Sequence, residues 1–485
     1  MGGTSFGGHW SATTRAVALT IVGLALSAVP AFAEPVLTRP EDRSRFTITT
    51  FASGLAFPTS MTALGDGSLL VATNAGGPQA WIGDNYIFTS PSAALVRLVD
   101  ANRDGVADGP GETVASGLPG LVSSIRRVGS VVMAISTASP TQSITLWRTG
   151  STPSAPLVSA GSLTLSVPSN HLHPPCALAA REAAGGVIEL YFNVGSQFNA
   201  TSGTATVGIT GAGGVSFTGT AASFQLAPEG IHRIVLTESG TTFTVSPPVQ
   251  IARGLRNAAG MVLAPNGDLL LNDNGADNPG NTAVSLSADE LNKITAADLG
   301  VVVPNFGFPG TYIDYATGAT VGPTAGITPP LAAFRPIDGR KSEGAVELSL
   351  APASFPADFT GGLFVPFSGV FNAGGVANDE NPLVFVDPTS GSYFHFLANG
   401  QMGHPNGLLA TDDALYLSDL SVTGAFGGVR NGVAADESGA IYRITYVPET
   451  SAWALAVLGT ACAFTAAGSR RLRRLCWPCG SVPSR

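Results

Sequence analysis

Two stretches of the chain share one pattern, a glycine turn followed by a short apolar run. They are Gly65-Asp66-Gly67-Ser68-Leu69-Leu70-Val71-Ala72-Thr73 and Asn266-Gly267-Asp268-Leu269-Leu270-Leu271-Asn272-Asp273. The Asp-Gly and Asn-Gly dipeptides supply the positive-φ positions that tight turns require. The apolar runs are continuous, which is typical of strands buried on both faces. Each stretch therefore predicts a tight turn that leads into a buried strand.

The same pattern returns in weaker form at four further places, so that six turn-strand units are spread along the chain. The weaker copies cover residues 129–135, 186–195, 362–368 and 413–419. Six units leave roughly 70 residues for each, which is enough for four strands and a loop. The repeat therefore predicts an all-β fold, a six-bladed β-propeller over residues 34–447. A tandem of β-sandwiches is the alternative.

The two ends of this predicted domain bear on how the ring closes. Residues 46–51 and 441–446 are strand-like, and pairing them in one blade would remove the exposed edges. Between the units, residues 196–227 are rich in Gly, Thr, Ala and Ser and interrupt the repeat. We therefore expect a closed ring that carries one long surface insertion.

The composition excludes several classes of protein. The chain has 485 residues, with 60 Gly and 34 Pro, and its interior lacks long helical periodicity, which argues against a helical bundle or a wound α/β sheet. Hydrophobic residues make up 44% of the chain, too many for a disordered protein. The net charge is −9, and residues 34–447 hold 32 of the 33 acidic residues but 18 of the 24 basic ones. Such a domain offers no basic surface to nucleic acid.

The first 33 residues have the pattern of an export signal. Arg15 precedes the apolar run 16–29, and Ala31-Phe32-Ala33 before Glu34 is an A-x-A cleavage pattern. A buried first helix is the alternative for this segment. We therefore expect residues 1–33 to be a signal peptide and the mature protein to be exported to the periplasm or the cell exterior.

The other end, residues 448–485, combines a turn, an apolar run and a basic cluster. The run 452–468 is barely long enough to span a bilayer, and Arg470-Arg471-Leu472-Arg473-Arg474 would hold the C-terminus in the cytoplasm. This tail resembles the PEP-CTERM sorting signal of Gram-negative bacteria, with Thr450 where that signal more often has Pro. The resemblance implies a transmembrane helix as an anchor, then processing by a dedicated sorting protease and delivery to the surface or the medium.

Cysteine is nearly absent from the predicted domain, where Cys176 stands alone. No disulfide framework is therefore expected there. Cys476-Trp477-Pro478-Cys479 has the spacing of a redox motif, but the βαβ context of a thioredoxin-like site is missing. The cysteines thus give no indication of redox chemistry.

Several motifs of the predicted domain occur in one characteristic order. They are Gly54-Leu55-Ala56-Phe57-Pro58, then Gly254-Leu255-Arg256-Asn257-Ala258-Ala259-Gly260-Met261, Asp273-Asn274-Gly275, Asp289-Glu290-Leu291-Asn292 and Asn305-Phe306-Gly307-Phe308-Pro309. This order resembles the soluble glucose/sorbosone dehydrogenases, six-bladed propellers that use pyrroloquinoline quinone (PQQ). The resemblance spans roughly residues 50–446, with residues 255–309 as its specific part. It implies oxidation of a sugar or alcohol by hydride transfer to PQQ while a general base removes the hydroxyl proton.

The resemblance also implies the residues of the site. His173 matches the general base, although Pro174-Pro175-Cys176 follows it where the family has Asn-Gly-Gly. Arg256 and Asn257 match the pair that contacts the quinone, and an arginine fork suits the carboxylates of PQQ. Gly275-Ala276 matches the Gly-Pro carbonyl site of the calcium that polarises PQQ. The structural alternatives are a turn histidine and an inter-blade ion pair of the arginine.

A second calcium motif stands apart from that site. The stretch Asp100-Ala101-Asn102-Arg103-Asp104-Gly105-Val106-Ala107-Asp108 places oxygen ligands at positions 1, 3, 5 and 9 and a glycine at position 6. This is the front of an EF-hand-like loop, in which Val106 at position 7 would offer its carbonyl. Gly111 occupies position 12, where that loop has glutamate. The motif predicts a calcium loop between blades, with a solvated acidic turn as the alternative.

Three functions are compatible with these observations. The first is an exported, tethered quinoprotein dehydrogenase for sugars or alcohols. The second is a non-catalytic propeller that binds glycans or proteins of an extracellular matrix. The third is a propeller hydrolase or lactonase, which would need a central calcium held by charged residues of several blades, and no such set aligns. Intact cofactor ligands separate the first from the second, and Arg256 is the one basic residue at a cofactor position.

Overall fold

The computed structural model describes residues 35–75, 80–82, 85–87, 92–138, 141–150, 152, 155–168, 170–278, 281–335, 344–369, 382–398, 402–421 and 438–448. The chain divides into two compact units, Met1–Ala33 and Glu34–Arg485, and all described residues belong to the second. The predicted signal peptide and, beyond residue 448, the predicted sorting segment lie outside the described residues. None of the helices in the described ranges has the length and apolarity to cross a membrane.

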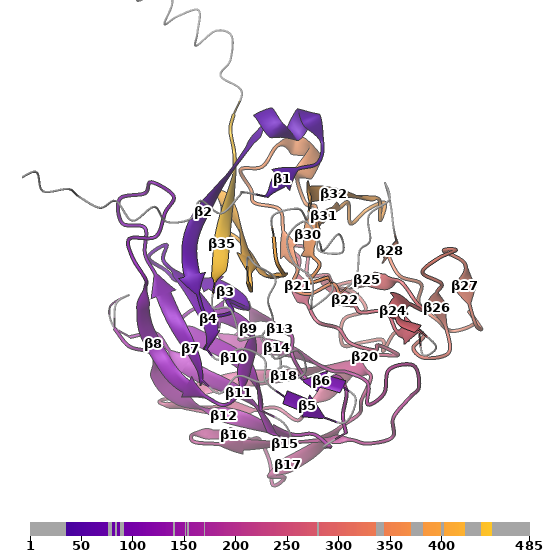
Figure 1. The fold of residues 1–485 in the computed structure, drawn as a ribbon. Helices are drawn as coiled ribbons and strands as arrows, with labels where there is room; N and C mark the ends of the chain where they lie inside the picture. Colours follow the sequence, from indigo (N-terminus) through magenta and orange to yellow (C-terminus); the bar gives the residue numbers. More distant parts are fainter. Residues whose placement is uncertain are drawn as a thin grey trace, which may run out of the picture. The chain divides into compact units, whose positions relative to one another are not determined.

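The second unit is an all-β, six-bladed propeller, as predicted (Figure 1). Each blade is an antiparallel sheet built on four strands. Blade 1 contains β3 (Ser60–Ala63), β4 (Leu69–Ala75), β7 (Ser92–Leu98) and β8 (Glu112–Leu118); blade 2 contains β9 (Leu121–Val128), β10 (Val131–Ala138), β11 (Thr141–Arg148) and β12 (Val158–Ser166); blade 3 contains β13 (Leu178–Ala183), β14 (Val187–Val194), β18 (Gly230–Ser239) and β20 (Val249–Arg253).

The remaining three blades follow in chain order, and the last is completed by the N-terminal strand. Blade 4 contains β21 (Met261–Leu263), β22 (Leu269–Asp273), β25 (Asp289–Ile294) and β28 (Ala332–Phe334); blade 5 contains β29 (Ser349–Leu350), β30 (Leu363–Pro366), β31 (Leu383–Val386) and β32 (Tyr393–Ala398); blade 6 contains β33 (Pro405–Ala410), β34 (Ala414–Asp419), β35 (Gly439–Tyr446) and β2 (Phe46–Leu55). The short strand β1 (Val36–Leu37) pairs with the outer edge of blade 5.

The first strands of the blades form the inner ring. β3 contacts β9, β9 contacts β13, β13 contacts β21, β29 contacts β33, and β33 contacts β3. Between blades 4 and 5 the backbones come so close that a Cβ added to Gly260 would lie 2.1 Å from the carbonyl oxygen of Val346. The ring therefore closes without a gap at the level of the first strands.

The six predicted turn-strand units all lie at the same place in the fold. Each covers the turn between the first and second strands of a blade, and the second strand itself: β4, β10, β14, β22, β30 and β34. In both strong copies the turn glycine adopts positive φ, +86° at Gly67 and +91° at Gly267. The repeat was thus a correct prediction of the blade number.

The continuous apolar runs are explained by two cores that share each second strand. Leu69 and Val71 of β4 pack in the cluster between blades 6 and 1, while Leu70 and Ala72 pack in the cluster between blades 1 and 2. The second strands of blades 3, 4, 5 and 6 alternate in the same way. Because both faces are buried, each Leu or Val side chain of these strands stabilises the fold by roughly 1.5–3 kcal/mol.

Pairing of the two ends closes the ring, as predicted. β2 pairs antiparallel with β35, with Phe46 opposite Tyr446 and Ile48 opposite Ile444. The two strands run side by side in Figure 1 although they come from opposite ends of the domain. The N-terminal strand thus becomes the outer strand of blade 6, and its pairing with β35 holds the two ends of the domain together.

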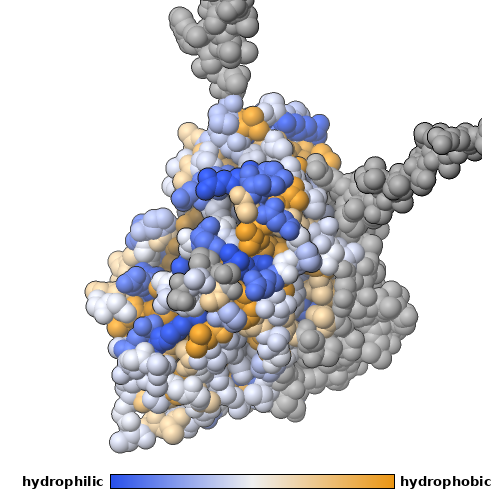
Figure 2. Space-filling model, turned by 90° about the vertical axis from the view of Figure 1, so that its left-hand side faces the viewer, coloured by the Kyte–Doolittle hydropathy of each residue, from blue (hydrophilic) through white to orange (hydrophobic). Residues whose placement is uncertain are grey.

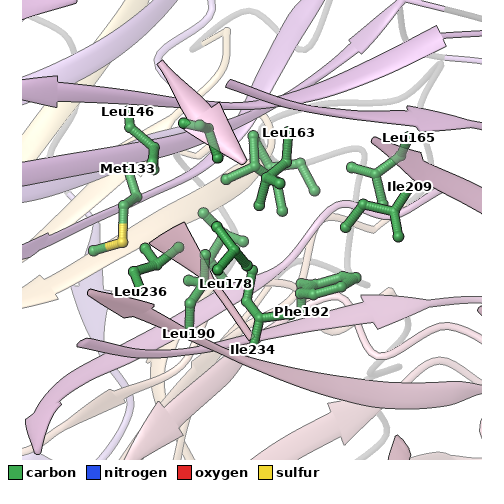
Figure 3. Close-up of a cluster of buried hydrophobic side chains, with 14 of the residues drawn as sticks. Met133, Leu146, Leu163, Leu165, Leu178, Leu190, Phe192, Ile209, Ile234 and Leu236 are labelled. Carbon is green, nitrogen blue, oxygen red and sulfur yellow. The ribbon is translucent and has the colours of Figure 1, made fainter. Parts of the chain in front are cut away.

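The prediction of a surface insertion at residues 196–227 was wrong in part, because much of this segment forms strands. β15 (Val207–Ala212) pairs with β12, β17 (Ser223–Leu226) pairs with β15, and β16 (Val215–Phe217) pairs with β19 (Thr242–Val245). These strands widen blades 2 and 3. Their apolar residues join the core between the two blades, where Ile209 faces Phe192 and Ile234 across the sheets (Figure 3).

The outer strands of the blades face water and have a mixed surface. On the side shown in Figure 2, hydrophobic residues lie in short bands between hydrophilic ones. Elsewhere on the exterior, Arg443 of β35 pairs with the exposed Asp413 at 3.1 Å. This is the pattern expected where a strand has one side chain in the inter-blade core and the next in solvent.

Candidate functional site

The loop that carries Arg256 and Asn257 is fixed by a carboxylate at the end of β22. Asp273 accepts the backbone N–H of Arg256 at 3.0 Å and that of Asn257 at 2.6 Å. Asp419, at the end of β34, does the same for the matching loop of blade 6. The propeller thus repeats one arrangement, in which a buried carboxylate binds the free donors of the loop before a first strand.

His173 lies in the loop between β12 and β13, and its ring is held at one nitrogen. Nδ1 is 3.0 Å from the Oγ of Ser196, and the backbone N–H donates to the Ser196 carbonyl at 3.1 Å. Within the described ranges, Nε2 has no hydrogen-bond partner. Burial, the charge of Arg256 and the neighbouring His171 hold the pKa of His173 well below its usual range. The ring is therefore neutral near pH 7 and able to accept a proton.

His173 and Arg256 meet at the segment Gly195-Ser196, which follows β14. The backbone N–H of Ser196 donates to the carbonyl of Arg256 at 2.7 Å, and its carbonyl accepts the N–H of His173. A Cβ added to Gly195 would lie 2.6 Å from the Cβ of His173 and 3.0 Å from the Arg256 carbonyl oxygen, so only glycine fits between them. The structure therefore brings together two of the predicted site residues from different inter-blade loops.

The guanidinium of Arg256 is buried and binds acceptors of the chain itself. Nε donates to the carbonyl of Asn199 at 2.9 Å and Nη2 to its Oδ1 at 2.7 Å, while Nη1 donates to the carbonyl of Asn274 at 3.4 Å. Nη2 also lies 3.5 Å from the carboxylate of Asp277. A carboxylate ligand would therefore have to displace Asn199 or Asp277 from the arginine fork.

Asn257 points toward the neighbouring loop of the same blade and toward blade 3. Its Nδ2 donates to Oδ1 of Asn274 at 2.9 Å, and its Oδ1 lies 3.7 Å from the thiol of Cys176. Burial raises the pKa of Cys176 to about 11. The thiol is therefore protonated and unreactive at neutral pH, and acts here as a weak hydrogen-bond donor.

Gly275 and Ala276 follow β22 after Asn274 and line the same cavity as Arg256. Their backbone N–H groups donate to Asp289 and Ser287, each at 2.7 Å. The carbonyl of Ala276 accepts the N–H groups of Leu286 at 2.7 Å and Ser287 at 3.3 Å, so it is engaged within its own hairpin. The carbonyls of Gly275 and Ala276 are the predicted calcium ligands. To bind an ion, the carbonyl of Ala276 would have to give up these two hydrogen bonds.

A cavity of about 100 Å³ lies beside these residues. Its lining includes Arg256, Gly275 and Ala276 together with Asp273 and Glu290, but not His173. Small-molecule sites usually measure 300–1,000 Å³, whereas one water molecule occupies about 30 Å³ of liquid. The cavity thus suits a few water molecules or an ion, and a quinone with a sugar would have to lie outside it.

The carboxyl groups around this cavity are difficult to ionise. Burial, followed by the nearby charges of Asp273 and Asp289, raises the pKa of Glu290 to about 8. Burial raises the pKa of Asp273 to about 7, against the opposing effect of its backbone hydrogen bonds and of Arg256. Near pH 7, Glu290 is therefore mainly a neutral acid that faces the cavity as a hydrogen-bond donor.

Glu290 should make the stability of the propeller depend on pH. Its pKa is raised in the folded state, so its contribution to stability is complete below about pH 4.5 and is lost as the pH rises through about 8. We expect the free energy of unfolding to fall by roughly 1–3 kcal/mol between pH 6 and pH 8.5. Glu290→Gln cannot ionise and should flatten this dependence in urea unfolding curves. The same pH dependence in both proteins would contradict the assignment.

The predicted calcium loop 100–108 has its side-chain oxygens turned toward its own backbone. Asp100 accepts the N–H groups of Asp104 and Gly105 at 3.1 and 2.9 Å, and Asp104 accepts that of Val106 at 2.9 Å. Asn102 and Asp108 accept the N–H groups of Asp104 at 2.9 Å and Ala101 at 2.6 Å. Over the ranges given above, no group of three His, Cys, Asp or Glu side chains is arranged to hold a metal.

Several residues of the site were not expected from the sequence. Ser196 joins His173 to Arg256, Asn199 binds the arginine fork, and Glu290 faces the cavity. The sequence did place Glu290 in a motif, but it gave no reason to assign it a role. Ser196 and Asn199 lie at the start of the Gly/Thr/Ala/Ser-rich segment, whose composition indicates a surface loop and gives no sign of a site.

Comparison with known proteins supports the fold. No protein-family model matches the chain, and no curated protein matches it. Among solved structures, a carbohydrate-active enzyme of family AA12 from Trichoderma reesei, in a calcium structure, is 14% identical and has a TM-score of 0.51, with 86% of this chain and 98% of that chain covered. The PQQ domain of pyranose dehydrogenase from Coprinopsis cinerea, in its holo form, is 15% identical, with the same TM-score and coverage. At these identities the likeness establishes the propeller fold.

Proposed function

We propose that this protein is a quinoprotein-type dehydrogenase that oxidises a hydroxyl group of a sugar or alcohol, with PQQ as its cofactor. The observation that carries the proposal is the meeting of a neutral His173 with Arg256 at Gly195-Ser196. The fold likeness to a PQQ domain of pyranose dehydrogenase adds support.

The donor atoms of the site fit PQQ and calcium in kind. Arg256 would bind a carboxylate of the quinone after releasing Asn199, and Asn257 would add an amide. The carbonyl of Gly275 and the carboxyl group of Glu290 lie next to the cavity and are oxygen ligands of the type that calcium takes, although Glu290 would have to release its proton to bind the ion. When bound, the quinone supplies the hydride acceptor.

The proton chemistry belongs to His173. Its Nε2 would accept the proton of the substrate hydroxyl as the carbon gives up its hydride. Burial, and after it the charge of Arg256, lowers the pKa of the ring, so the ring is neutral before the reaction. Ser196 holds the ring at the opposite nitrogen, so that Nε2 keeps its orientation.

Reconstitution tests the proposal. The purified protein is titrated with PQQ in the presence of calcium, PQQ binding is followed by absorbance, and dye reduction is measured over a panel of aldoses and alcohols. Arg256→Ala removes a charge-assisted fork worth roughly 1.5–3 kcal/mol, so PQQ binding should weaken by about 10–100-fold. If the wild-type protein neither binds PQQ nor reduces the dye, the proposal fails.

A second candidate is a non-catalytic propeller that binds glycans or proteins outside the cell. The observation in its favour is that the fork of Arg256 is already satisfied by Asn199, Asn274 and Asp277. A protein of this kind would bind a glycan in an array or by calorimetry without any response to PQQ. That outcome separates it from the dehydrogenase.

The loop 100–108 is proposed as a separate, structural calcium site. Its oxygens lie within one tight turn around Gly105, and an ion bound only by the native state would stabilise the protein by mass action. We expect a chelator to lower the melting temperature of the wild type and to have no effect on Asp104→Ala. Identical melting curves of the wild type with and without chelator would show that the loop is only a turn.

Export and surface sorting are proposed from the sequence of the two ends. We infer that residues 1–33 direct export and that residues 448–485 anchor the protein to the membrane until a sorting protease acts. Deleting residues 448–485 should release soluble protein into the periplasm or the medium. If the shortened protein stays with the membrane fraction, the anchor lies elsewhere.

A further inference from the structure

The ring of His173 has two possible neutral forms, and only one leaves Nε2 free to take a proton. We propose that Ser196 is a positioning residue that fixes the Nδ1–H tautomer of His173 and so makes Nε2 the proton-accepting atom. The inference deepens the proposed function and rests on it for its catalytic meaning. The tautomer itself is a property of the protein without cofactor or substrate.

The hydrogen bonds of Ser196 determine the direction of its bond to His173. Its Oγ lies 2.7 Å from the carbonyl oxygen of Phe198 and 3.0 Å from Nδ1 of His173. A carbonyl oxygen can only accept, and two oxygens at 2.7 Å without a proton between them would repel. The single hydroxyl proton of Ser196 therefore lies toward Phe198. Nδ1 of His173 must then carry the proton that it shares with Oγ.

Ser196 is also well placed to hold this geometry. Its side chain and backbone are fully buried, with 0% of the residue exposed. Its N–H donates to the carbonyl of Arg256 at 2.7 Å, and its carbonyl accepts the N–H of His173 at 3.1 Å. The residue is thus bound at three atoms, so its hydroxyl has little freedom to turn away from the ring.

The neighbouring histidine has the opposite tautomer and provides an internal control. Nε2 of His171 lies 3.1 Å from the carbonyl of Gly195, so it must carry the proton. Nδ1 of His171 is buried and lacks a partner among the described residues. Two histidines of one loop, two residues apart, are therefore expected to differ in which nitrogen is protonated.

Nitrogen-15 NMR of the apo protein with labelled histidine tests the assignment directly. Above pH 7, His173 should show a protonated Nδ1 and an unprotonated Nε2, and His171 the reverse. The variants His173→Gln and His171→Gln identify the two signals. A protonated Nε2 on His173 in the wild-type protein would by itself overturn the proposal, and no Ser196 variant is needed for this test.

Variants at position 196 separate positioning from mere packing. Ser196→Ala should shift His173 toward the Nε2–H form, and Ser196→Thr, which keeps the hydroxyl, should retain the Nδ1–H form. Ser196→Asp should keep the tautomer and move the titration of His173 to higher pH, because a carboxylate favours the imidazolium. Ser136→Ala is the matched control, since Ser136 is a buried serine whose hydroxyl has no partner in the described part of the chain. An unchanged tautomer in Ser196→Ala would overturn the proposal.

The activity of these variants links the tautomer to the reaction. Ser196→Ala should lower kcat by less than the 10²–10⁴-fold that loss of a general base costs, with little change in KM. Ser196→Asp should move the acidic limb of the pH profile to higher pH. If the NMR result holds but neither the wild type nor any variant oxidises a substrate, the proposed function fails and the tautomer assignment remains valid. A normal kcat in Ser196→Ala with a shifted tautomer would overturn the positioning role.

Discussion

His173→Ala should lower kcat of the PQQ-loaded protein by roughly 10²–10⁴-fold, the usual contribution of a general base. The expected loss is large because Nε2 of His173, within the described ranges, is an unpartnered nitrogen on a ring that is neutral near pH 7. The side chain is removed without touching Arg256, so PQQ binding should survive. Stopped-flow or steady-state dye reduction gives kcat, and an absorbance titration gives the affinity for PQQ.

His171→Ala is the matched control for this prediction. His171 comes from the same loop and is buried, but its Nε2 donates to the Gly195 carbonyl, so it cannot accept a proton there. We expect this variant to change stability more than kcat. If His173→Ala retains wild-type kcat, or if His171→Ala loses as much, His173 is not the base. Loss of PQQ binding in His173→Ala would instead indicate that the histidine contacts the cofactor or supports its site.

The fold could be predicted from the sequence because its signals are local. A Gly turn and a continuous apolar run recur once per blade, and this pattern predicts a turn and a buried strand without reference to distant residues. Leu69 to Ala72, for example, are apolar on both faces of the strand. The strands within residues 196–227 were not predicted, because they pair at blade edges and contain few large apolar side chains. The apolar residues that these strands do carry join the core of blades 2 and 3: Val207, Ile209, Val215, Phe217 and Leu226.

The candidate site could be predicted only where a motif marked it. His173 and Arg256 were found by resemblance, and their meeting depends on Gly195 and Ser196, which carry no local signal. The closure of the ring brings together residues that are far apart in the chain. Arg126 and Glu347 are separated by 221 residues, and nothing in the sequence around either one indicates the other.

This ion pair has the largest expected effect on stability. Arg126 of β9 in blade 2 donates to Glu347, which precedes β29 in blade 5, at 3.0 Å, and to the carbonyl of Met261 in blade 4 at 3.2 Å. Glu347 also accepts the hydroxyl of Ser124, and its side chain is 2% exposed against 18% for Arg126. The pair thus links blades that are separated along the ring. Arg126 and Ser124 bind the buried carboxylate of Glu347, and burying this charge without such partners would cost much free energy.

Arg126→Met should therefore lower the free energy of unfolding by roughly 3–5 kcal/mol, because it leaves the carboxylate of Glu347 buried without its counter-ion. The double variant Arg126→Met with Glu347→Leu removes both charges and should recover most of that loss. Glu238→Gln, in the exposed pair with Arg148, is the control and should cost at most about 1 kcal/mol. Urea unfolding of the four proteins measures these differences.

The pH dependence distinguishes a buried charge from lost packing as the cause. Burial already raises the pKa of Glu347, and Arg126 opposes that shift, so removing Arg126 should raise the pKa further. A carboxyl group whose pKa is raised in the folded state stabilises the fold at low pH and loses that contribution as the pH rises through the shifted value. The deficit of Arg126→Met should therefore shrink as the pH is lowered from 8 to 5. A deficit that is constant with pH, or that persists in full in the double variant, would assign the effect to the lost arginine stem and not to the unpaired carboxylate.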